Sequence, residues 1–253
     1  MGRIRILAML TSVIGLALPM SIVGSLAQSA ATVNCGTFVN TQVGFSTNNW
    51  HGAPQPSTYE GVSANLTDRF GYVLCDSDTR GGFNFVTTRD MVFSNDGTGY
   101  AQSGTMYRYG YNGCVKRWAE QSFSGVFNDY YIGGCSGQNE THDYWQQMVF
   151  SNGSYVVRSN IDSTIIHQST QNPFAYWTRP LQVGLDAESY YAINSIPGRN
   201  ASREDYDGIQ VQLFSNDGFV GSCGNIYLGQ FDQNPTKWNV TAPSCSHTQT
   251  WDN

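Results

Sequence analysis

Short runs of β-branched and aromatic residues alternate with clusters of Gly, Asn, Asp and Ser along the chain from Gln28 onward. No long segment has the 3.6-residue apolar period of an amphipathic helix. This pattern is typical of short strands joined by turns. The predicted strands are Tyr72–Leu74, Phe83–Thr87, Met91–Phe93, Tyr100–Ser103, Met106–Tyr109, Tyr130–Ile132, Trp145–Phe150, Tyr155–Ser159, Thr164–His167, Ile209–Phe214 and Phe219–Gly221.

One local motif occurs three times, at 91–97, 148–153 and 212–218. In each, an apolar strand end runs into Ser-Asn, a Gly follows, and an aromatic residue opens the next run. Gly supplies the positive φ that a tight turn needs, so we expect three hairpins. Spacings of 57 and 64 residues could indicate a threefold repeat such as a trefoil. The intervening sequence does not repeat, which favours independent use of one turn.

The composition shows no break that would separate domains, and many short antiparallel strands favour a β-sandwich. We therefore expect one antiparallel β-sandwich domain over 28–253. The segment from Asn34 to Pro56, rich in Asn, Thr and Gly, is expected to wrap an edge of the sheets.

The first residues resemble a signal peptide. Arg3 and Arg5 precede an apolar stretch, and Ser25-Leu26-Ala27 supplies the small residues of a cleavage site, so residues 1–27 are expected to be removed on export. An uncleaved membrane anchor is the alternative, because the apolar stretch approaches spanning length. We thus expect an extracellular, secreted protein with no membrane association after cleavage.

The charge argues against anionic partners. Removing Arg3 and Arg5 from the 13 basic residues leaves 11 against 19 acidic residues, a net charge of −8. An acidic chain without a Lys/Arg cluster is not expected to bind nucleic acid. The partner is instead expected to be an extracellular polypeptide or glycan, and the oligomeric state stays open. No cofactor and no metal are expected.

Six cysteines follow the cleavage site, an even number that predicts three disulfides in an exported chain. Six cysteines allow 15 pairings. We favour the sequential pairing, which closes local loops, over a zinc site, because no Cys-x-x-Cys pair occurs. The predicted pairs are Cys35 with Cys75, Cys114 with Cys135, and Cys223 with Cys245; five Asn-x-Ser/Thr sequons, at Asn65, Asn139, Asn152, Asn200 and Asn239, permit glycosylation.

The sequence shows no motif of a Ser-His-Asp hydrolase. None of the four histidines adjoins a nucleophile motif, and Gly-x-Ser-x-Gly does not occur. His167 is expected to be an ordinary strand residue. Glutamates are few, and two contexts stand out: Gln102 in Gly99–Gly104, and Glu188 among the apolar and aromatic residues of Gly184–Tyr191. Burial would raise the pKa of such a carboxyl and suit it to general acid and base catalysis.

These two segments resemble the glutamic peptidases (eqolisins) and the related neprosin-like secreted proteins. Ala101-Gln102-Ser103-Gly104 is similar to the family's Leu-Gln-Thr-Gly segment, and Ala187-Glu188 is similar to its Ala-Glu segment about eighty residues later. The resemblance implies a concanavalin-like jelly roll and an acid-active endopeptidase. It makes Gln102 the residue that polarises the scissile carbonyl and Glu188 the residue that activates the water.

The alternative function is glycan binding by a noncatalytic extracellular or surface protein of the same fold. Aromatic rings stack on sugar faces, although the core of an all-β protein also buries large aromatic side chains. A glycosidase version needs two carboxyls at a defined separation, and Glu120 with Glu188 is the pair we nominate. The candidate stacking residues are Trp50, Trp118, Trp145, Trp177, Trp238 and Trp251.

Overall fold

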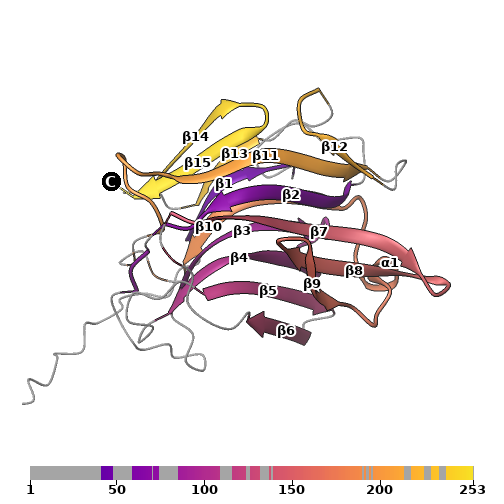
Figure 1. Ribbon diagram of the computed structural model, residues 1–253. Coiled ribbons are helices and arrows are strands. Elements are labelled where there is room, and N and C mark those ends of the chain that lie inside the picture. The colour runs from indigo at the N-terminus through magenta and orange to yellow at the C-terminus, as the bar shows by residue number, and fades with distance from the viewer. Residues whose placement is uncertain are drawn as a thin grey trace, which may run out of the picture. The chain divides into compact units, whose positions relative to one another are not determined.

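The computed structural model shows two antiparallel β-sheets packed face to face (Figure 1). All the residues it describes fall in one compact unit, 32–253, and residues 1–40 lie outside the described part. The described residues are 41–47, 59–69, 71–73, 85–108, 116–123, 126–131, 137, 139–189, 191, 194, 196–213, 218–224, 229–233 and 238–252.

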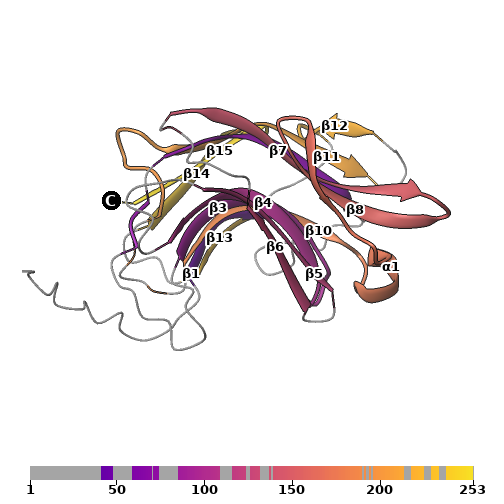
Figure 2. The same cartoon turned by 60° about the horizontal axis from the view of Figure 1, so that its bottom comes forward.

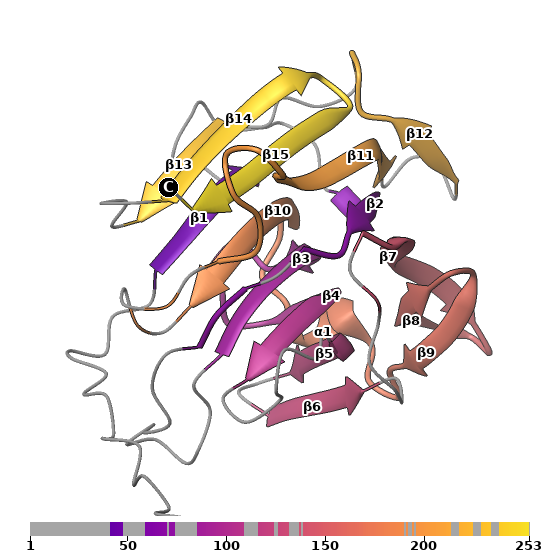
Figure 3. The same ribbon diagram turned by 60° about the vertical axis from the view of Figure 1, so that its left-hand side comes forward.

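The first sheet has seven strands, which follow one another in Figure 3. In spatial order they are β13 (Gly229–Gln233), β1 (Thr41–Ser46), β10 (Gln182–Ser189), β3 (Phe85–Phe93), β4 (Tyr100–Arg108), β5 (Lys116–Phe123) and β6 (Val126–Tyr131). Figure 2 shows that this sheet arches, with its concave face turned away from the other sheet.

The second sheet has eight strands and covers the convex side of the first (Figure 2). Its order is β14 (Trp238–Ser244), β15 (His247–Asp252), β11 (Glu204–Leu213), β2 (Tyr59–Thr67), β7 (Thr141–Ser151), β8 (Ser154–Ile161) and β9 (Thr164–Gln168), with β12 (Phe219–Gly221) paired to β11. One short helix, α1 (Pro173–Tyr176), begins at an Asn172 cap. Among the described residues, no helix has the length and apolar character needed to span a membrane. The predicted antiparallel sandwich is confirmed.

The core lies between the two sheets. Val92, Ala101 and Leu185 of the seven-stranded sheet pack with Leu66 and Tyr206 of the other. Alternate residues of each strand point into this layer, as a half-buried sheet requires.

A chain of polar side chains also crosses this core. Gln121 donates to Ser159 (3.0 Å), Ser159 to Gln146 (2.7 Å), Gln146 to Ser103 (2.5 Å) and Ser103 to Asp90 (2.9 Å). All five side chains are buried, and each donor of the series finds an acceptor. This satisfies most of their polar atoms, which would otherwise be costly to bury.

The hairpin predictions are confirmed where the structure describes them. β3 pairs with β4 around Gly97 (φ 70°), and β7 pairs with β8 around Asn152 and Gly153 (φ 52° and 82°). β11 and β12 form the third antiparallel pair, although turn residues 214–217 lie outside the described part.

Several strand boundaries were predicted wrongly. The described part of Phe83–Thr87, which begins at Phe85, and Met91–Phe93 belong to one strand, β3, because Arg89 and Asp90 are buried in its middle, one on each face, with polar partners. Tyr100–Ser103 and the described part of Met106–Tyr109, which ends at Arg108, likewise merge into β4. Tyr72 forms only a single bridge, not a strand. Strands β1, β2, β5, β10, β13, β14 and β15 were not predicted.

One predicted disulfide can be assessed and is confirmed. Cys223 and Cys245 are bonded and tie β14–β15 to the end of β12. The remaining cysteines, Cys35, Cys75, Cys114 and Cys135, lie outside the described residues.

Candidate functional site

Polar side chains gather on the concave face of the seven-stranded sheet. Strand alternation puts Val183, Leu185 and Ala187 of β10 in the core, so Asp186 and Glu188 point to the opposite, concave face. Register pairing extends this face to the neighbouring strands. We call the set the concave-face cluster; its members are Gln42, Arg89, Tyr100, Gln102, Glu120, Asp186 and Glu188.

Arg89 is the cation of the cluster. Its guanidinium donates twice to Asp186, at 2.7 and 3.0 Å, and once to Glu188. Gln42 donates to the other Glu188 oxygen at 2.8 Å. Arg89, Asp186 and Glu188 are at most 4 % exposed. Burial disfavours the charged form of Arg89, but Asp186 and Glu188 outweigh it and raise its pKa.

Two glycines allow the neighbouring strands to pack closely beside this ion pair. Gly44, Asp186, Arg89 and Gly104 form one row across four strands. A Cβ on Gly44 would lie 2.6 Å from the Asp186 Cβ, and a Cβ on Gly104 would lie 2.7 Å from the Arg89 Cα. Only glycine allows the flanking strands to approach this closely.

The concave-face cluster has two halves: the first is the Arg89 ion pair with Asp186 and Glu188, and the second brings the carboxyl of Glu120 against the carboxamide of Gln102. Gln102 and Glu120 are register partners on β4 and β5, and Gln102 Nε2 donates to Glu120 Oε1 at 3.1 Å. The Tyr100 hydroxyl donates to the same oxygen. Burial, and next the charge of Glu120, raise the pKa of Tyr100, which keeps the phenol protonated as a donor.

The carboxamide oxygen of Gln102 is free to accept a hydrogen bond. Gln102 is 3 % exposed, and among the described residues Oε1 has no hydrogen-bond partner. A buried acceptor without a partner is costly. Because Nε2 faces a carboxylate, which only accepts, the orientation of the amide follows from its partner. A water or a substrate N–H would satisfy Oε1 beside the half-buried Glu120.

Gln102 and Glu188 lie on the same concave face, but the structure does not bring them together. Glu188 pairs with Thr87 and Gln102 with Met91, so one strand and four residues of β3 separate them. With about 3.3 Å per residue and about 4.8 Å between strands, their Cα atoms are about 16 Å apart. Glu120 is one strand farther from Glu188 than Gln102 is, because it lies on β5. Arg89, which sequence reasoning missed, lies between the two halves.

Electrostatics still links the two halves. After burial and Glu120, the pKa of Tyr100 responds to the charges of Arg89 and Glu188 as well. Asp186 could have been identified from the sequence, because it lies two residues before Glu188 in a stretch that alternates with Val183, Leu185 and Ala187. Its pKa is raised by burial and lowered by Arg89.

Tryptophan does not form an exposed row in the described part of the chain. Trp118, Trp177 and Trp238 are buried, at 1–4 % exposure. Trp145 and Trp251 are half-buried, and the guanidinium of Arg203 covers the Trp251 ring at 3.9 Å. Trp50 lies outside the described residues.

The described histidines belong to the other sheet: His142 on β7, His167 on β9 and His247 on β15. His167 is a strand residue, as predicted, and its ring stacks on Tyr130 at 3.8 Å. Within the described residues, one group could hold a metal ion: Asp68, Glu140 and His142, whose ligand atoms lie within 4.8 Å of one another.

The comparisons with known proteins identify no family. No protein-family model matches the chain, and no curated protein matches it. Among solved structures, the chain is similar to the catalytic domain of an endo-1,3-beta-glucanase (laminarinase) from Thermotoga petrophila RKU-1, with a TM-score of 0.38 and 7 % identity over 86 % of this chain and 78 % of that one. A likeness of this size says nothing about the residues of the site.

Proposed function

We propose that the protein is an exported, acid-active hydrolase that cleaves polypeptides with a carboxyl–carboxamide pair, as the resemblance to glutamic peptidases implies. The observation that carries the proposal is the Gln102–Glu120 contact beside an unsatisfied carboxamide oxygen. Glu120 therefore takes the role that the resemblance assigned to Glu188. Glu188 remains a second carboxylate of the same face, held by Arg89 and Gln42.

Hydrolysis follows from these groups. A water bound between Gln102 Oε1 and Glu120 loses a proton to Glu120, and its oxygen adds to the carbonyl carbon of the scissile amide. The second hydrogen of Gln102 Nε2 is donated to the resulting oxyanion. The protonated Glu120 then gives its proton to the leaving nitrogen as the C–N bond breaks. Tyr100 holds Glu120 in place throughout.

The acidic working range is what the resemblance to glutamic peptidases implies; in this arrangement one carboxyl both takes the proton of the water and supplies it to the leaving amine. The described histidines, His142, His167 and His247, lie on strands of the other sheet. The rival function, noncatalytic glycan binding, would use stacking rings. The described tryptophans are buried or half-buried, so they do not supply such a row of rings.

The test is cleavage of a denatured protein from pH 2 to 7 by the mature chain and its variants. Glu120→Gln is expected to lower kcat about 10² to 10⁴-fold. Gln102→Leu is expected to lower it about 10² to 10³-fold. Asp207→Asn, an exposed carboxyl on β11, is the matched control and should leave the rate unchanged.

Other outcomes decide between the remaining assignments. Loss of activity in Glu188→Gln with retention in Glu120→Gln would return the reacting carboxyl to Glu188. Absence of cleavage by the wild type at every pH would reject the peptidase and favour glycan binding. Circular dichroism of each variant shows whether the fold is kept.

A further inference from the structure

A second group of chemically active side chains lies outside the concave-face cluster. Asp68 directly follows β2, and Glu140 and His142 lie at the start of β7. Backbone pairing holds the two segments together: the Asp68 N–H donates to the Glu140 carbonyl at 2.8 Å, and the Asn139 N–H donates to the Asp68 carbonyl at 2.9 Å. The three side chains thus meet on a fixed backbone.

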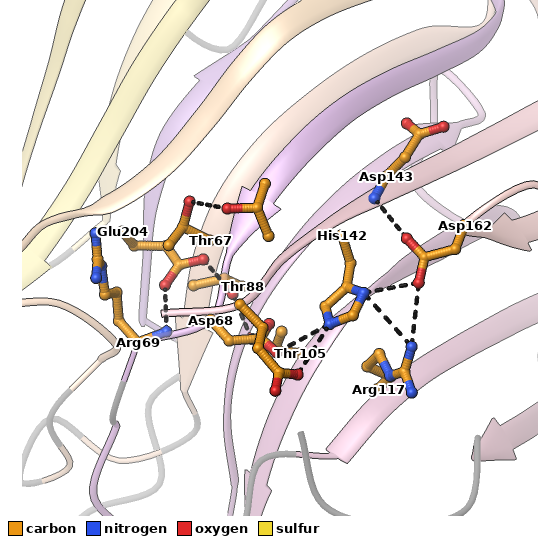
Figure 4. A network of polar contacts seen from close by, with 12 residues as sticks. Thr67, Asp68, Arg69, Thr88, Thr105, Arg117, His142, Asp143, Asp162 and Glu204 are labelled. Carbon is orange, nitrogen blue, oxygen red and sulfur yellow. Dashed lines mark hydrogen bonds and ion pairs between the residues drawn. The ribbon is translucent and has the colours of Figure 1, made fainter. Parts of the chain in front are cut away.

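The orientation of His142 leaves one ring nitrogen for a ligand. Nδ1 lies 2.7 Å from Asp162 Oδ2, and because a carboxylate only accepts, Nδ1 carries the proton. Nε2 then lies 3.8 Å from Asp68 Oδ2 and 3.4 Å from Glu140 Oε2, a long hydrogen-bond contact that a metal ion between them would replace. Figure 4 shows the His142 ring between Asp162 and Asp68. A histidine whose far nitrogen is fixed by a carboxylate is the usual arrangement at metal sites.

Asp162 is itself held in position. Its Oδ1 accepts the Asp143 N–H at 3.1 Å, and its Oδ2 accepts from Arg117 at 3.2 Å. Asp162 therefore orients the imidazole and is not one of the three candidate ligands.

An independent observation also points to a missing ligand. The Tyr144 hydroxyl is fully buried, and it has no hydrogen-bond partner among the described residues. Tyr144 lies two residues after His142 on the same face of β7, with its ring edge-on to the imidazole at 6.4 Å. A water bound to a metal at this point would give the hydroxyl a partner.

We propose that Asp68 Oδ2, Glu140 Oε2 and His142 Nε2 bind a divalent first-row transition cation, with water completing its coordination. Nε2 lies 3.8 Å from Asp68 Oδ2 and 3.4 Å from Glu140 Oε2, distances that suit ligands about 2.0–2.2 Å from one ion. The imidazole favours zinc and its neighbours over calcium or magnesium, which prefer oxygen alone. The ion would also offset two carboxylates, one of them, Asp68, fully buried. Sequence reasoning missed this site because Asp68 lies far from the Glu140-x-His142 pair in the chain.

The test is a Zn²⁺ titration of the purified full mature chain, in competition with a chromophoric chelator. One equivalent is expected to bind. Glu140→Gln, at an exposed position where folding is not at risk, should weaken the affinity at least about tenfold, and Asp162→Asn should weaken it about 10- to 100-fold while leaving all three ligands in place. His142→Gln should abolish stoichiometric binding.

His247→Gln is the matched control, because His247 also pairs with an aspartate, Asp205, at 3.0 Å but belongs to no such group. Its affinity should equal that of the wild type. Wild-type protein without stoichiometric binding, or equal affinities in Glu140→Gln and His247→Gln, would overturn the proposal.

Discussion

Gln102 Nε2 lies 3.1 Å from Glu120 Oε1, although 17 residues separate the two in the chain. The contact exists because β4 and β5 pair in a register that sets these residues directly opposite each other. Side chains opposite each other on one face of a sheet are close enough to interact. A shift of the register by one residue would turn one of them into the core. The proposed chemistry therefore depends on the pairing of two strands.

Replacing Arg89 by Met should destabilise the protein strongly. The substitution leaves Asp186 and Glu188 buried without their cation. We expect a loss of about 3–5 kcal/mol in the free energy of unfolding at pH 7, measured by urea denaturation. The loss should shrink at acidic pH, because a protonated Asp186 needs no counter-charge. Arg89→Lys should recover only part, since an ammonium cannot bind Asp186 through two parallel hydrogen bonds.

Arg158 supplies the control for this prediction. It is half-buried and donates to Gln168 at 2.7 Å. Arg158→Met should cost less than about 1 kcal/mol. If Arg89→Met is no less stable than Arg158→Met, the ion pair does not hold the concave face together.

Replacing Gly104 by Ala should also destabilise the fold. The new Cβ would lie 1.9 Å from the Thr88 carbonyl oxygen, so β3 and β4 must separate. A cost of about 3 kcal/mol is expected from this overpacking, measured by denaturant unfolding. Gly221 is the control, because a Cβ there meets nothing within 4 Å and Gly221→Ala should change stability by less than about 0.5 kcal/mol. Equal stabilities of the two variants would refute the close approach.

Asp90 should make the stability of the wild type fall as the pH rises. Burial raises the pKa of Asp90 well above 3.8, only partly opposed by hydrogen bonds from Ser103 and Gln146. The folded state then holds a proton that the unfolded chain has lost, so stability is full below about pH 4 and declines up to the folded pKa. Each unit between the two pKa values costs about 1.4 kcal/mol.

Asp90→Asn removes this titration and keeps an oxygen for the Ser103 hydroxyl. The difference in unfolding free energy between variant and wild type should therefore rise in favour of the variant from pH 4 to pH 7. Urea denaturation at several pH values measures it. If the unfolding free energies of variant and wild type change equally with pH, Asp90 has the same pKa in the folded and the unfolded chain, which would contradict the prediction.

The turns of this fold could be predicted from the sequence because their chemistry is local. Gly97 and Gly153 have the positive φ that the Ser-Asn-Gly motifs predict. The disulfide between Cys223 and Cys245 also follows from sequence proximity. The strand interiors were harder, because polar residues such as Arg89 and Asp186 are buried there only through partners on other strands.

Three members of the candidate site were predicted from the sequence, but Arg89 and the pairing of the carboxyls were not. Gln102, Glu188 and Glu120 all lie on the concave face, as a sandwich with a functional sheet face requires. Which carboxyl faces Gln102 depends on strand order and register, which join β4 to β5 and put β3 between β4 and β10. No local pattern encodes that order. The metal-site candidate was missed for the same reason.

The central claim is that Gln102 and Glu120 act as one unit, and a double-mutant cycle on polypeptide cleavage tests it most directly. The rates of Gln102→Leu, Glu120→Gln and the double variant are compared with the wild type at the pH of maximal activity. Residues that work as a unit are strongly non-additive, so the double variant should be about as slow as the slower single variant. If the rate of the double variant is instead reduced by the product of the two single reductions, Gln102 and Glu120 act independently, which would contradict the central claim.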